Sequence, residues 1–164
     1  MAAAALAPIG AKWDRSDAIA LARPACTLCA GRGMVCPRAR PSRPCTCVLR
    51  AIFRACLERY RNFHARPAEG MRWGWKHLDY CADFELAARR ELDALDYQVF
   101  RLHFLEACEW GPCARRLKLS KGNFFHAVYR VEERLGRCFR ELRPYGLWPL
   151  DLYFHNGAKS ANAS

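Results

Sequence analysis

The chain has 164 residues, and its 27 Lys+Arg against 16 Asp+Glu give a formal net charge of +11. This length allows one domain or two small ones, and it excludes an eight-stranded α/β barrel, which needs roughly 250 residues. A hydrophobic share of 52% argues against disorder. The excess of positive charge favours an anionic partner, and nucleic acid is the commonest of these.

The positive charge is concentrated in two segments. Residues 1–66 carry 12 basic and 3 acidic side chains, 67–110 carry 5 and 9, 111–143 carry 9 and 3, and 144–164 carry one of each. Two basic segments flanking an acidic one predict two contact surfaces. We expect five parts: an N-terminal arm (1–22), a cysteine-rich knuckle plus basic helix (23–66), a linker and acidic helix (67–94), a helical domain (95–143), and an apolar segment with a disordered tail (144–164).

The first ten residues are apolar, but no basic residue precedes them and Pro8 interrupts them. We therefore expect no secretory signal. The sequence also contains no run of about 18 apolar residues, the length that a membrane span requires. These features predict a soluble, cytoplasmic protein. Disulfides do not persist in a reducing compartment, so the closely spaced cysteines among the ten are expected to bind a metal.

Two close cysteine pairs lie on either side of a loop rich in Pro, Gly and Arg. Cys26 and Cys29 have the C-x-x-C spacing of a metal knuckle, and Cys45 and Cys47 follow beyond the loop. Four thiolates in this arrangement suit one tetrahedral Zn²⁺. Its role is expected to be structural, because the segment offers no His, Asp or Glu as a general base.

The fourth ligand has an alternative, because Cys36 lies between the two pairs in sequence and could substitute for one of the four. Unliganded cysteines in a loop are the other interpretation of the segment. The string Cys26-x-x-Cys29-x-Gly31-x-Gly33 resembles half a repeat of the zinc domain of the J-domain co-chaperones. This resemblance implies zinc binding and nothing further.

Helical periodicity begins directly after the second cysteine pair. Apolar residues at 48, 52, 56, 60 and 63 predict an amphipathic helix over 48–63, with arginines that include Arg50 and Arg54 beside the apolar stripe. Phosphate contact and an ordinary solvated face are equally good interpretations of these arginines. Residues 64–75 predict a linker, and a helix with a solvated acidic face is expected from Leu78 to about Ala94.

Three further helices are predicted over 93–142. The first covers 93–108 with Asp93 or Asp96 as its cap, and the second covers 109–119 with Pro112 in its first turn. Ser120 caps the third, which runs to about Leu142 and carries an apolar stripe. The stripe consists of Phe124, Val128, Val131 and Leu135, continued by Phe139.

The order and spacing of elements over 95–142 resemble the helix-turn-helix in the fourth region of bacterial sigma factors and related regulators. The matching elements are Leu102-His103-Phe104-Leu105-Glu106, Ala114 to Ser120, Lys121-Gly122-Asn123-Phe124, Arg130, and Glu133-Arg134-Leu135. The resemblance implies that the third helix enters the major groove of DNA while the second braces across the backbone.

If the apolar stripe is buried, the opposite side of the third helix faces DNA. The candidates for contact with base edges are Lys121, Asn123, His126 and Arg130. The candidates for phosphate contact are Arg115, Arg116 and Lys118, with Arg50 and Arg54 from the first basic segment. Phe125 and Tyr129 lie near the exposed side, where they could pack on the linker or the tail, or contact a thymine methyl.

The sequence therefore predicts a mainly α fold in which a zinc knuckle precedes a helical bundle containing a helix-turn-helix. The expected function is that of a sequence-specific, nucleoid-associated transcription regulator that binds double-stranded DNA. Its combination of parts loosely resembles phage antitermination and late transcription factors, and the zinc lobe and acidic middle could contact RNA polymerase. The alternative is a zinc-stabilised RNA-binding or protein-interaction module. An enzyme is not expected, since no acid/base or nucleophile constellation is present.

Overall fold

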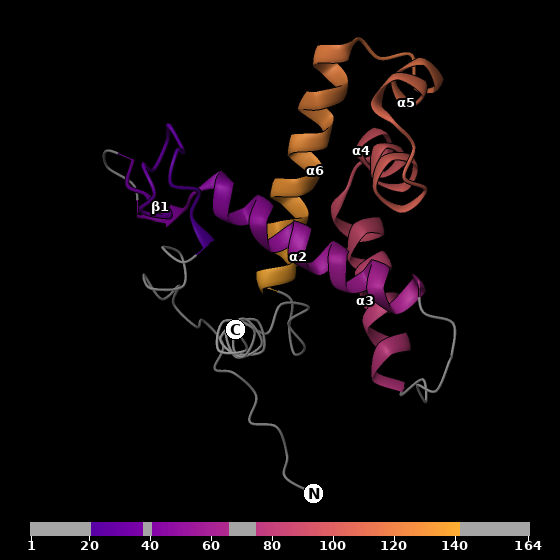
Figure 1. Cartoon of the computed structure of the whole chain (residues 1–164), viewed down its shortest axis with the longest axis horizontal. Helices are drawn as coiled ribbons and strands as arrows, with labels where there is room; N and C mark the ends of the chain where they lie inside the picture. The colour runs from indigo at the N-terminus through magenta and orange to yellow at the C-terminus, as the bar shows by residue number, and fades with distance from the viewer. Residues whose placement is uncertain (1–20, 38–40, 66–74, 142–164) are drawn as a thin grey trace, which may run out of the picture.

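A computed structural model describes residues 21–37, 41–65 and 75–141 (Figure 1). The N-terminal arm up to residue 20, residues 66–74 of the predicted linker, and the C-terminal segment predicted over 144–164 lie outside the described residues. In the described part of the chain, no helix is both long enough and apolar enough to cross a membrane.

The fold is mainly α-helical, as predicted, and a cysteine cluster precedes the helices. Two short antiparallel strands come first, β1 (Met34–Val35) and β2 (Arg43–Pro44), with Met34 opposite Pro44. The helical elements follow in chain order: α2 (Thr46–Ala65), α3 (Trp75–Glu91), α4 (Ala94–Val99), the π-helix η1 (Phe100–Leu105), α5 (Trp110–Arg116) and α6 (Lys121–Glu141).

Helices α2 and α6 cross one another and form the most extensive helix contact of the fold (Figure 1). The predicted apolar stripe of α6 is buried along its length, which confirms the helical periodicity. At the crossing, a Cβ atom on Gly136 would lie 2.7 Å from the carbonyl carbon of Leu49. Only glycine therefore allows α6 to approach the backbone of α2 this closely.

Aromatic side chains from four helices fill the centre of the fold. Phe53 of α2 stacks on Phe139 of α6, with ring centroids 6.1 Å apart, and meets Phe104 of η1 edge-on at 4.9 Å. Phe84 of α3 lies 4.9 Å from Phe139 and 5.8 Å from Phe100. The segments predicted as separate parts of the chain thus share one hydrophobic core.

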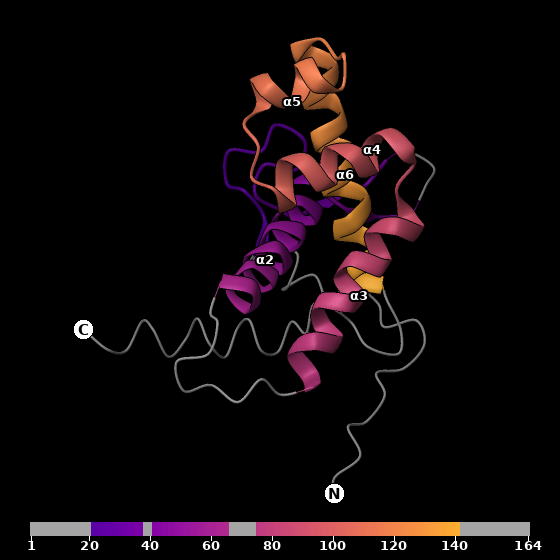
Figure 2. The same cartoon turned by 90° about the vertical axis from the view of Figure 1, so that its right-hand side faces the viewer.

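Helices α4, η1, α5 and α6 occupy the stretch predicted as a helix-turn-helix, and α5 lies beside the N-terminal end of α6 (Figures 1 and 2). The predicted caps are present: the backbone N–H of Asp96 donates to the Asp93 side chain, and that of Asn123 donates to the Ser120 hydroxyl. The first helix differs from the prediction because its second half is π-helical and ends at Leu105. The second helix ends at Arg116, since Lys118 turns the chain with a positive φ of 55°.

Candidate metal centre and nucleic-acid interface

The four cysteines named from their spacing converge at the start of α2. The β1–β2 pairing places the second pair against the knuckle, and the N–H of Cys45 donates to the carbonyl of Gly33 at 2.8 Å. The sulfur atoms of Cys26 and Cys45 are 3.7 Å apart, as are those of Cys29 and Cys47. All four ligand atoms lie within 4.8 Å of one another.

These distances match the requirement of a tetrahedral metal site. With metal–sulfur bonds of about 2.3 Å, as for zinc, the sulfur atoms of a tetrahedron are about 3.8 Å apart. Thiolate sulfur is a soft donor that selects zinc or iron over magnesium and calcium. The cluster is therefore compatible with one tetrahedral metal ion, and Cys36, which is exposed, is not a member of it.

The backbone of the knuckle is shaped for this cluster. Ala30, Gly31 and Gly33 have φ values of 47°, 77° and 74°, the left-handed region in which glycine is unstrained. The N–H of Ala30 donates to the carbonyl of Cys26, and both the backbone N–H and Nε of Arg32 donate to that of Cys29. The glycines after the first pair thus allow the chain to turn tightly at this point.

The thiols of the cluster differ in acidity. Backbone N–H groups of Cys29 and Leu28 stabilise the Cys26 thiolate and lower its pKa to about 6. Burial raises the pKa of Cys47 to about 12 and also raises that of Cys45. A metal ion must displace protons from such buried thiols, so binding couples metal affinity to pH.

Arg50 and Arg54, which were predicted to contact phosphate, form ion pairs with glutamates of the same chain. Arg50 pairs with Glu133 at 2.6 Å and Arg54 with Glu132 at 2.9 Å, both on α6. The guanidinium of Arg50 also lies 4.3 Å from the ring centroid of Tyr129. Tyr129 therefore packs against α2, an arrangement that the sequence analysis did not anticipate.

Arg130, which was predicted to contact a base, forms a bidentate ion pair with Asp96 of α4. Its Nη2 and Nε donate to the two carboxylate oxygens at 2.6 and 3.1 Å. The Asp96 side chain is fully buried, whereas that of Arg130 is 48% exposed. The hydrogen bond to Asp96 raises the pKa of Arg130. This pair fixes α4 against the middle of α6.

The remaining predicted contacts are exposed and gather around the turn between α5 and α6. Lys121, Asn123 and His126 lie on the N-terminal part of α6, and Arg115, Arg116 and Lys118 lie at the end of α5 and in the turn. Of the charged members of this group, none has an ion pair within the described residues. The fold thus presents cations and an amide together at one end of α6.

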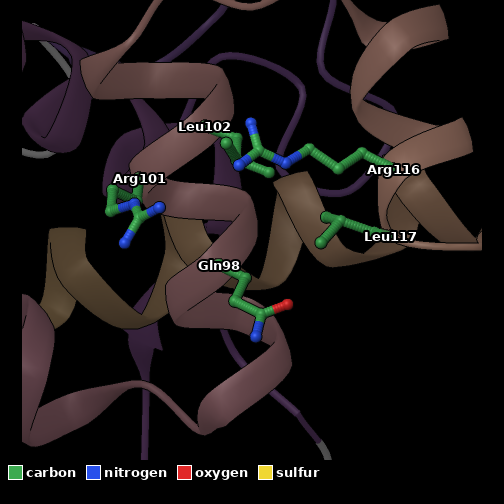
Figure 3. A pocket seen from close by; sticks show the side chains of 5 residues that line it. All are labelled: Gln98, Arg101, Leu102, Arg116 and Leu117. Atoms are coloured by element: carbon green, nitrogen blue, oxygen red, sulfur yellow. The ribbon is translucent and has the colours of Figure 1, made fainter.

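Arg116 also borders a cavity of about 230 Å³ between η1 and α5, which Gln98, Arg101, Leu102 and Leu117 complete (Figure 3). Figure 3 shows Arg116 reaching from α5 toward Leu102. Arg101 of η1 pairs at 3.2 Å with Glu106, the residue that follows this helix. Gln98 and Arg101 were not predicted from sequence, because a cavity wall that combines residues of α4, η1 and α5 has no local pattern.

Comparisons of the chain with models of protein families, with curated proteins and with solved structures found no match.

Proposed function

We propose that this protein is a sequence-specific DNA-binding transcription regulator with a structural zinc ion, and that α6 enters the major groove. The observation that carries the proposal is the exposed N-terminal end of α6, where Lys121, Asn123 and His126 are presented beside α5. A recognition helix contacts base edges with its N-terminal residues, while the preceding helix crosses the backbone.

The residues at this end divide into two roles. Asn123 can pair bidentately with adenine and Lys121 can donate to guanine, so these two side chains and His126 supply sequence discrimination. Arg115, Arg116 and Lys118 supply phosphate contacts that set the register. Arg130 donates two hydrogen bonds to the carboxylate of Asp96, and we therefore assign it a structural role that fixes α6 against α4. Arg50 and Arg54, paired with α6, also have a structural role.

Zinc is the metal that suits a closed site of four thiolates, because structural zinc sites are four-coordinate and leave no open position. The cysteine-rich segment has few large buried apolar side chains, so metal binding would supply its folding free energy. Elemental analysis of the purified protein is expected to find about one zinc per chain, lost in Cys26→Ser and retained in the matched Cys36→Ser variant. Iron, or no metal in the wild type, would refute the zinc assignment.

Selection from a random duplex library on the immobilised full-length protein tests the DNA proposal. We expect a recovered motif, and binding to this motif that exceeds binding to a scrambled duplex at every salt concentration. Asn123→Ala should weaken binding to the motif by about 5- to 150-fold, since a lost bidentate pair costs roughly 1–3 kcal/mol. Asn62→Ala, an exposed asparagine on α2, is the matched control and should leave binding unchanged.

The alternative is the zinc-stabilised RNA-binding or protein-interaction module. Equal affinity for motif and scrambled duplex, falling equally with added salt, would favour this module and exclude base recognition. RNA polymerase as a partner and nucleoid association follow from the sigma-like resemblance. We include them in the proposal, and co-purification of polymerase with the tagged protein from cells tests the first of them.

A further inference from the structure

An exposed tryptophan stands beside the proposed recognition helix. Five large apolar side chains are exposed in the described part of the chain: Leu28, Leu86, Leu95, Trp110 and Tyr129. Tyr129 and Trp110 are similarly exposed, at 41% and 43%, and each has a cation over its ring. Trp110, the first residue of α5, is the larger of the two and its cation is Lys121, at the N-terminal end of α6. Exposing so large an indole to water is unfavourable, so a partner that covers it gains affinity.

The Trp110 ring is held against the first turns of α6. Its centroid lies 6.0 Å from that of Phe125, and Nζ of Lys121 lies 5.1 Å from it. Phe125 in turn meets Phe124, which is fully buried in the core. The exposed indole is therefore a positioned surface, fixed to the end of α6 that carries Lys121 and Asn123.

The charge around this surface indicates an anionic partner. Lys121, Arg115 and Arg116 lie on the two helices that form it, together with Lys118 in the turn between them. Glu109, the residue before Trp110, is exposed and opposes them with a single negative charge. An aromatic ring flanked by cations is the combination by which proteins contact nucleic acids.

We propose that Trp110 packs against the deoxyribose-phosphate backbone of duplex DNA at the edge of the groove that α6 enters. This inference rests on the proposed DNA-binding function and adds a contact that the sequence analysis did not name. Since the sugar-phosphate backbone is common to all sequences, the contact contributes affinity without discrimination. Because the indole is uncharged, the contact releases no counterion.

The test compares full-length variants on the selected motif and on a scrambled duplex over a salt series. Trp110→Ala should weaken binding to both duplexes by about tenfold, with an unchanged slope of log affinity against log salt. Arg115→Ala should lower the magnitude of that slope by about one, the signature of a lost phosphate contact. Leu86→Ala on α3, which removes a side chain of matched 43% exposure, should change neither quantity.

Hydroxyl-radical labelling of the wild-type protein provides a measurement that needs no variant. DNA binding should protect Trp110 from oxidation and leave Leu86 as reactive as in the free protein. The inference is overturned if the wild type binds DNA while Trp110 stays equally reactive or Trp110→Ala binds as tightly. A wild type that binds neither duplex overturns the proposed function as well, so the two failures are distinguishable.

Discussion

Lys118 forms the turn between α5 and α6 with a left-handed backbone, at φ 55°. Its N–H donates to the carbonyl of Arg115 and the N–H of Leu119 donates to that of Ala114, the paired bonds of a Schellman motif. A left-handed conformation costs a residue with a Cβ roughly 1–2 kcal/mol, which glycine avoids. Lys118→Gly should therefore raise the free energy of unfolding by about 0.5–1 kcal/mol after the larger entropy of unfolded glycine is included. Urea denaturation measures the change.

The control for this prediction is Lys118→Ala, which removes the charge but keeps the Cβ atom. Its stability should stay within about 0.5 kcal/mol of the wild type. Equal gains from glycine and alanine would contradict the backbone explanation and point to charge repulsion around the turn.

Asp96 and Arg130 join a buried carboxylate to a half-exposed guanidinium. Arg130→Met leaves a fully buried negative charge without its partner, and we expect a loss of about 2 kcal/mol. This value is lower than for a fully buried pair because solvent reaches Arg130. The double variant Asp96→Leu/Arg130→Met should recover most of the loss, since it removes both charges. Thermal and urea unfolding of the wild type, the double variant and the two single variants, Arg130→Met and Asp96→Leu, measure the coupling.

The pair of Arg134, one turn after Arg130 on α6, and Asp93, the N-cap of α4, provides a comparison. This pair is 3.5 Å apart with side chains 49% and 56% exposed, so Arg134→Met should change stability by less than about 0.5 kcal/mol. If both methionine variants cost the same, burial of Asp96 is not the cause of the difference.

Single residues also show where prediction from sequence reaches its limit. The clustering of the four cysteines was predictable because each pair is local, and close spacing has few explanations other than a shared metal ion. The ion-pair partners of Arg50 were not predictable, since Glu133 lies 83 positions away and no local pattern links the two residues. Trp110 was missed for a related reason, because its significance depends on the neighbouring helix.

At the scale of elements, Gly136 determines how closely α2 and α6 can cross. Gly136→Ala places a methyl group against the Leu49 carbonyl, which neither backbone can easily avoid. We expect a loss of about 1–3 kcal/mol from the forced separation of the helices, partly offset by the better helix propensity of alanine. Thermal unfolding followed by circular dichroism measures the effect.

Gly122→Ala is the matched control in the first turn of the same helix. A Cβ atom there meets nothing within 4 Å, so the substitution should be neutral or stabilising by up to about 1 kcal/mol. Opposite signs for the two substitutions would establish that the crossing requires glycine. A stabilising Gly136→Ala would show that α6 can move away from α2 without cost.

The helices themselves were largely predictable. Periodic apolar residues specify α2, α3 and α6 locally, and Asp93 and Ser120 cap where they were expected to. The crossing of α2 and α6 was not predictable, because the residues around Gly136 in the sequence do not distinguish it from an exposed helical glycine. Nothing in the pattern over 93–108 indicated that Phe100–Leu105 is π-helical.

At the scale of the whole molecule, the cysteine cluster and the proposed DNA-binding helix belong to one core. Cys45 and Cys47 flank the start of α2, and the following two turns of α2 carry Leu49, Arg50 and Phe53, which contact α6. The sequence predicts the cysteine lobe and the helix-turn-helix as successive parts of the chain. Their packing against one another depends on pairing between residues far apart in sequence.

Removing the metal should therefore affect the full chain and not the cysteine lobe alone. Structural zinc contributes on the order of 10 kcal/mol of folding free energy. Chelation should therefore remove the anchor of the first turns of α2 and expose the surface by which α2 packs against α6. We expect hydrogen exchange to accelerate over 26–53 and also over 129–139, with a lower Tm for the whole protein. Cys36→Ser, which keeps the cluster intact, should match the untreated wild type. Unchanged protection of 129–139 after complete metal removal would show that α6 is stable independently of the cysteine lobe.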